Sequence, residues 1–224
     1  MNSVKIVAAV CFALAVLPSC KKKNTVKPVI PPPDTAVSRP MFNFLPMYPG
    51  NYWVYEVFVI DSQGIATSIQ EYDSCYITED TIMPGYKTLV KAVMGNHETL
   101  FLRQEGNNIV DHHGKVHFSQ DYTTVFAQKW FISPMYAHDD TIAYVKHFMG
   151  ERNHFTTVPA GSFHTTSFIE EYNMQHPWDN YGRKRCYYHR YAEGIGIVSE
   201  TAAFYLQSPI VYERRLVRYN VKRK

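Results

Sequence analysis

From residue 41 onward, short hydrophobic runs alternate with polar positions at every second residue. Residues 51–61 place Trp53 and Tyr55 on one face, and the opposite face of this run is also largely apolar. A strand with two apolar faces is typical of the inside of a sheet. Similar patterns predict further strands over residues 65–79, 86–94, 99–105, 108–112, 115–119, 124–132, 141–150, 153–158, 164–172, 183–191, 196–205 and 210–221.

Turn residues separate these runs and keep the connections short, as in the PAG hairpin tip at residues 159–161. Short connections favour antiparallel pairing of neighbouring strands, and only residues 119–129 and 163–174 leave a helix open as an alternative. A sheet of about a dozen strands has to curl or close. The sequence therefore predicts a mainly β domain over residues 41–224. We expect a single curved antiparallel sheet, a half-barrel or open barrel, with few or no helices.

Residues 1–19 have the layout of an export signal. Lys5 precedes an unbroken apolar run over residues 6–17, which is too short to span a bilayer. The run ends in the tetrapeptide LPSC, which resembles the lipobox of bacterial lipoproteins and ends at Cys20. This resemblance implies that Cys20 becomes the lipidated first residue and anchors the protein in a membrane. An ordinary secretory signal with a cysteine at its cleavage site is the alternative.

Residues 20–40 have the composition of a disordered tether. They contain five of the 13 prolines, and five Lys and Arg residues against a single acid, Asp34. Proline-rich chain extends by about 3.1 Å per residue, so the tether could reach on the order of 60 Å. In some bacterial groups an acidic run after the lipidated cysteine marks export to the cell surface. Because no such run follows Cys20, the resemblance implies an outer-membrane lipoprotein that faces the periplasm.

Composition narrows the class of protein further. The chain has 224 residues, of which 46% are hydrophobic and 15% aromatic, with a formal net charge of +3. These values exclude a collagen-like or fully disordered chain. The positive excess lies in the tether, and the body is slightly negative. We therefore expect no nucleic acid among the partners.

Several segments of the body resemble a widespread group of uncharacterised secreted and lipidated bacterial proteins. The segments are YPGNYWVYEV, DTIMPGYKTL, TVPAGSF and YAEGIGIVSE, followed by ERRLVRYNV near the carboxyl end. That group is similar to the periplasmic lipoprotein carriers of the LolA/LolB kind, which have open, curved antiparallel sheets. The resemblance implies such a fold here. The shared motifs are turns and strand edges, so they bring no catalytic residue with them.

Two cysteines remain in the body, Cys75 and Cys186, and both fall in predicted strands. Outside the cytoplasm such a pair can oxidise, so a disulfide is predicted, with two separate buried thiols as the alternative. His112, His113 and His117 lie close together in sequence, but no metal-binding spacing such as HExxH or CxxC accompanies them. Solvent-facing histidines are the favoured interpretation, and we expect neither a metal nor another cofactor.

No catalytic motif stands out. Ser162 follows a hairpin turn rather than the strand–turn–helix of a GxSxG nucleophile. The adjacent acidic pairs at residues 139–140 and 170–171 would point to opposite faces of a strand, whereas glycosidase carboxylates converge across a cleft. We therefore expect a protein that is not an enzyme, with a hydrolase as the least favoured reading.

Aromatic residues suggest two kinds of binding. An apolar inner face of the curved sheet would bind an apolar ligand, a lipidated partner or an envelope protein, and this is the favoured function. Trp178 instead lies in a polar loop with His176 and Tyr181, which together form a candidate exposed contact patch. The alternative function is therefore glycan binding through these loop aromatics.

The lipobox resemblance gives the first testable prediction. In Cys20→Ala the acceptor thiol is lost, so we expect the protein to lose acyl labelling and to leave the detergent phase in a phase-partitioning assay. The parent chain is expected to label and to partition into detergent. Equal partitioning of the variant and the parent chain would contradict the lipoprotein assignment.

Overall fold

The structure is a computed structural model that describes residues 44–82, 88–94, 99–132, 141–180, 182–202 and 211–222. The predicted export signal, Cys20 and the tether lie outside the described residues, and so does Tyr181. Within these ranges, no helix is long and apolar enough to cross a membrane. Residues 31–224 form one compact unit.

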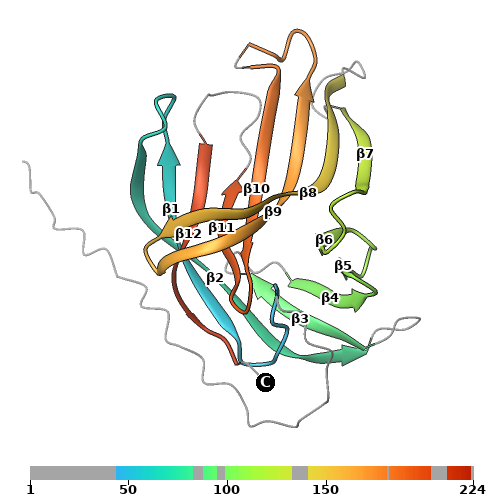
Figure 1. Cartoon of the computed structure of the whole chain (residues 1–224), viewed down its shortest axis with the longest axis vertical. Coiled ribbons are helices and arrows are strands. Elements are labelled where there is room, and N and C mark those ends of the chain that lie inside the picture. The colour runs from blue at the N-terminus through green and yellow to red at the C-terminus, as the bar shows by residue number, and fades with distance from the viewer. Residues whose placement is uncertain are drawn as a thin grey trace, which may run out of the picture. The chain divides into compact units, whose positions relative to one another are not determined.

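The described residues form one antiparallel sheet of twelve strands, and they contain no helix (Figure 1). Across the sheet the strands follow the order β6-β5-β4-β3-β2-β1-β12-β11-β10-β9-β8-β7. The strands are β1 (Tyr52–Ile60), β2 (Ala66–Ile82), β3 (Thr88–Met94), β4 (Thr99–Glu105), β5 (Asn108–Asp111), β6 (Val116–Ser119), β7 (Val125–Ile132), β8 (Thr141–Val158), β9 (Gly161–Met174), β10 (Lys184–Ala192), β11 (Gly196–Ala202) and β12 (Val211–Asn220).

The predicted fold class is confirmed, with one local difference. The separate strands predicted over residues 141–150 and 153–158 form one strand, β8. Between them, Glu151 and Asn153 adopt positive φ values of 47° and 60°. These residues absorb a register shift against β9 without ending the strand. Residues 161–174, where a helix was left open in part, form β9.

The sheet curls until it is nearly closed into a barrel. Its two edge strands are β6 and β7, and β6 also meets the far part of the sheet across the interior. The Tyr191 hydroxyl donates a hydrogen bond to the His117 carbonyl oxygen at 2.9 Å, and the Phe118 and Tyr191 rings lie 4.9 Å apart. These contacts join β6 to β10, so the inner face of the sheet serves as the core.

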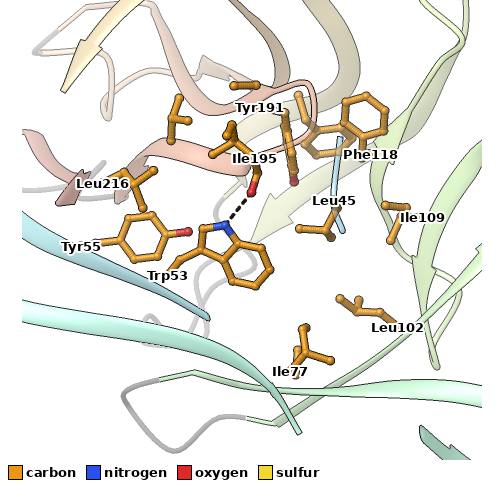
Figure 2. Packing of buried hydrophobic residues seen from close by; sticks show 14 of the residues in the cluster. Leu45, Trp53, Tyr55, Ile77, Leu102, Ile109, Phe118, Tyr191, Ile195 and Leu216 are labelled. Atoms are coloured by element: carbon orange, nitrogen blue, oxygen red, sulfur yellow. Dashed lines mark hydrogen bonds between the residues drawn. The ribbon is translucent and has the colours of Figure 1, made fainter. Parts of the chain in front are cut away.

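Trp53 lies at the centre of this core (Figure 2). Its side chain is 1% exposed, and its indole N–H donates a 2.6 Å hydrogen bond to the Ile195 carbonyl oxygen in the β10–β11 turn. Gly196, at the end of that turn, has a φ of +107°, and a Cβ there would lie 3.0 Å from the indole nitrogen. The turn therefore needs glycine both for its backbone and for the close approach of Trp53.

Hydrogen bonds to backbone groups hold the surrounding segments against this centre. The fully buried Asn51 donates to the Pro46 carbonyl oxygen and accepts from the Lys222 N–H, each at 2.9 Å. The β8–β9 hairpin crosses in front of β11 and β12 in Figure 1, and its Ala160 N–H donates to the Leu216 carbonyl oxygen at 2.9 Å. The start of β1, the end of β12 and the hairpin tip are thereby held against the core.

The Trp53 contact predicts that Gly196 tolerates substitution worse than another glycine of the same backbone conformation. Gly182 is the matched control, because its φ is +110° and nothing lies within 4 Å of its missing Cβ. Both alanine variants carry the strain of a positive φ, but only Gly196→Ala crowds a buried ring. We expect Gly196→Ala to lower the free energy of unfolding by about 1–3 kcal/mol more than Gly182→Ala. Urea unfolding measures both, and equal losses would contradict the packing argument.

Candidate functional site

A cavity of about 440 Å³ remains inside the curled sheet. This volume falls within the range of small-molecule sites, roughly 300–1,000 Å³. Its walls come from strands that are distant in sequence, from β6 at one end of the strand order through to β10. One wall is mainly apolar and the other carries charged side chains.

The apolar wall follows from the two-residue period of four neighbouring strands. On each strand, two residues that are two positions apart face the cavity, since alternate side chains of a strand point to the same face. These pairs are Trp53 and Tyr55 on β1, Cys75 and Ile77 on β2, Ala92 and Met94 on β3, and Leu100 and Leu102 on β4. The small side chain of Ala92, which is 1% exposed, leaves space at the middle of this wall.

The charged wall begins at Arg214 on β12. Its guanidinium bonds to the carboxylates of Asp73 on β2 and Glu200 on β11. The other oxygen of Glu200 lies 2.9 Å from His189 Nδ1 on β10. The neighbouring strands β12, β11 and β10 therefore place the Glu200 carboxylate between two cations, Arg214 and His189.

The same chain of charges continues to β9 and to the β5–β6 turn. His189 Nε2 lies 3.7 Å from Glu170 Oε1, and Lys115 Nζ donates to that oxygen at 3.4 Å. The second Glu170 oxygen accepts a 3.0 Å hydrogen bond from the Tyr172 hydroxyl. Positive and negative groups therefore alternate along the wall, which offsets the cost of their burial.

Mutual pairing keeps these groups ionised. Burial opposes the charged form of His189, yet Glu200 and Glu170 outweigh it and raise the His189 pKa to about 9. Burial also opposes the charged form of Glu200, but His189 and Arg214 lower the Glu200 pKa to about 2. The pKa of Glu170 is held well below its usual range, against burial, by His189 and Lys115. At neutral pH the wall is therefore a set of fixed charges.

His117 completes the charged side of the cavity in a neutral form. Its Nε2 lies 3.0 Å from Asp111 Oδ2, and burial lowers its pKa despite that contact. The expected solvent-facing position is therefore wrong for His117, which points into the cavity, whereas His113 is exposed. Across the described ranges, no three His, Cys, Asp or Glu side chains are grouped so that they could hold a metal ion.

The predicted disulfide is not formed, because Cys75 and Cys186 are both free thiols. Cys75 lines the cavity from β2, and burial raises its pKa to about 12. Cys186 lies on β10, and three strands, β1, β12 and β11, separate β10 from β2. His189 and Tyr191 on β10 face the cavity, and because alternate residues of a strand point to opposite faces, Cys186 faces away from it. A bridge needs Cβ atoms that point at each other, and this topology separates them.

The predicted contact patch is only partly exposed. His176 is exposed, with 87% of its side chain accessible, but Trp178 is half-buried. Trp178 is not the exposed ring that its polar neighbours suggested, because the loop returns it to a second hydrophobic cluster. That cluster consists of Ile142, Ala143, Val145, Tyr172, Met174 and Tyr187.

Two features of the surface and cavity escaped the sequence reasoning. Trp130 on the edge strand β7 is 58% exposed, and its ring centroid lies 4.8 Å from that of Tyr144. The sequence predicts a strand there but does not indicate that this ring is exposed. The charged wall was also missed. Its one signal in the sequence is that Arg214 and Leu216 share a face of their strand, which places a charge at an inward position.

No family model matches this chain, and no curated protein matches it. Two crystal structures are similar to it: a "putative exported protein with YmcC-like fold" from Bacteroides fragilis and a "putative lipoprotein" from Parabacteroides distasonis. Both are 14% identical to this chain, with TM-scores of 0.43 and 0.38. In each case the similarity covers 79% of this chain and 98% of the other. These descriptions apply to those two proteins.

The charged wall predicts a pH-dependent contribution to stability. A histidine whose pKa rises from about 6.5 unfolded to about 9 folded stabilises the protein fully below pH 6.5 and loses this effect as the pH rises to 9. We therefore expect the difference in unfolding free energy between the parent and His189→Gln to shrink by on the order of 3 kcal/mol between pH 6 and 9.5. Urea unfolding across this range measures it. A constant difference would contradict the pairing.

Proposed function

We propose that this protein is a lipid-anchored cell-envelope protein that binds an apolar small molecule, without catalysis, in the cavity of its curled sheet. The observation that carries the proposal is the interior space of about 440 Å³ with one continuous apolar wall. Close packing fills most protein interiors, so a space of this size inside a core is unusual unless something occupies it. Burial of apolar surface would supply the affinity, at about 0.8 kcal/mol for each methylene group.

The groups around the cavity support binding rather than chemistry. Cys75 is the one thiol in the lining, and a pKa of about 12 keeps it protonated and a poor nucleophile. His189 and Glu200 stabilise each other's charged form, which raises the His189 pKa to about 9 and lowers the Glu200 pKa to about 2. Neither group is therefore available as an acid or base near neutral pH. These three groups of the lining therefore favour a receptor that holds its ligand unchanged, whereas His117 is a neutral imidazole in the same lining.

The amino end supports a location where such a ligand occurs. Lipidation at Cys20 would hold the domain near a membrane, and the tether would let it move on the order of 60 Å from the surface. The motif resemblance is to a group of uncharacterised secreted and lipidated proteins whose fold is similar to that of LolA/LolB carriers, and it supports the fold more than the activity. The membrane is thus both the proposed anchor and the proposed source of the ligand.

Binding of a neutral fluorescent probe, N-phenyl-1-naphthylamine, to residues 31–224 tests the proposal. We expect saturable binding with a stoichiometry of one. Ala92→Leu should weaken it at least tenfold, because the larger side chain fills the cavity from β3. Ala66→Leu is the matched control, since Ala66 lies on β2 outside the lining and should leave binding unchanged.

Two outcomes would contradict the proposed function. The first is no saturable binding by a protein that still unfolds cooperatively. The second is binding that Ala92→Leu and Ala66→Leu affect equally, because the probe would then occupy another surface. A cooperative thermal transition in both variants is the control for folding.

A further inference from the structure

The charges that face the cavity do not cancel. Three cations belong to the lining, Lys115, His189 and Arg214, against the single carboxylate of Glu200. His189 counts as a cation because its pKa is about 9. The two other carboxylates of the charged wall, Asp73 and Glu170, contact these cations but are not part of the lining. A molecule inside the cavity therefore contacts more cations than carboxylates, although the charged wall as a whole pairs three cations with three carboxylates.

These three cations lie next to one another. Lys115 and His189 both approach the same Glu170 oxygen, at 3.4 and 3.7 Å. His189 and Arg214 both contact Glu200. Two shared carboxylates thus hold the cations in one row, and strands β10 and β12 and the β5–β6 turn fix their positions.

Access to this row is at Lys115. The Lys115 side chain is 49% exposed although it also lines the cavity, whereas Arg214 is 18% exposed. The row therefore runs from solvent into the interior, beside the apolar wall of Trp53 and Leu102. Lys115 makes a long, partly exposed ion pair with Glu170, and such pairs contribute little to stability. Its ammonium can exchange Glu170 for a ligand anion at low cost.

We propose that the cavity binds an amphiphile with a single anionic headgroup, a long-chain carboxylate, whose headgroup contacts Lys115 and whose chain lies against the apolar wall. His189 and Arg214 lie deeper in the cavity and keep their carboxylate partners. This inference rests on the proposed function, because it names the chemistry of the ligand for the same cavity. A cationic amphiphile would place a second positive charge beside the Lys115 ammonium, and a neutral one would gain only from its chain.

Displacement of the neutral probe from residues 31–224 by four dodecyl compounds tests the headgroup. We expect dodecanoate to compete at least tenfold more strongly than dodecanol, and dodecylamine to compete least. Dodecyl phosphate distinguishes a phosphate-bearing source of the anion from a carboxylate. Lys115→Met should weaken dodecanoate about five- to tenfold and leave dodecanol unchanged, whereas Lys222→Met, at an exposed lysine outside the lining, should change neither.

The outcomes separate this inference from the proposed function. Equal competition by dodecanoate and dodecanol, or no effect of Lys115→Met, would overturn the anionic headgroup while the cavity remains a binding site. Competition by dodecyl phosphate without competition by dodecanoate would overturn the carboxylate. A neutral probe that does not bind at all would overturn the proposed function itself.

Discussion

A wide antiparallel sheet that no helix covers can bury its hydrophobic residues only against itself, and this constraint governs the described structure. Twelve strands curl until β6 meets β10 across the interior. Every second residue of each strand then faces inward. Trp53 fixes the curvature, because its bond to the Ile195 carbonyl oxygen ties β1 to the β10–β11 turn. Where the inward side chains are too small to meet, the same geometry leaves a cavity.

The curled sheet also explains how charges can lie inside a core. Arg214 shares the inward face of β12 with Leu216, so the strand must bury a guanidinium along with a leucine. An isolated buried charge is very costly, but the carboxylates of Asp73 on β2 and Glu200 on β11 compensate it. This row of fixed charges gives the cavity one polar wall beside its apolar one.

Local signals predicted the strands well, because two-residue alternation and turn residues are written within each run. The β1 residues, for example, were expected at 51–61 and form Tyr52–Ile60. Features that depend on which strands face each other were not predictable in this way. Cys75 and Cys186 both read as strand residues, but their opposite faces appear only once the strand order is known. His117 and Trp178 were misplaced because their surroundings depend on strand pairing: His117 faces the cavity, and Trp178 packs against β8, β9 and β10.

The two thiols allow one measurement that tests directly whether the proposed ligand enters the cavity. In residues 31–224, Cys75 lines the cavity and Cys186 lies outside it, so each protein molecule carries its own control. Mass spectrometry after timed reaction with a small neutral thiol reagent reports both rates. The account predicts that saturating dodecanoate slows modification of Cys75 at least tenfold and leaves Cys186 unchanged. Equal Cys75 rates with and without dodecanoate, while dodecanoate still displaces the fluorescent probe, would contradict it.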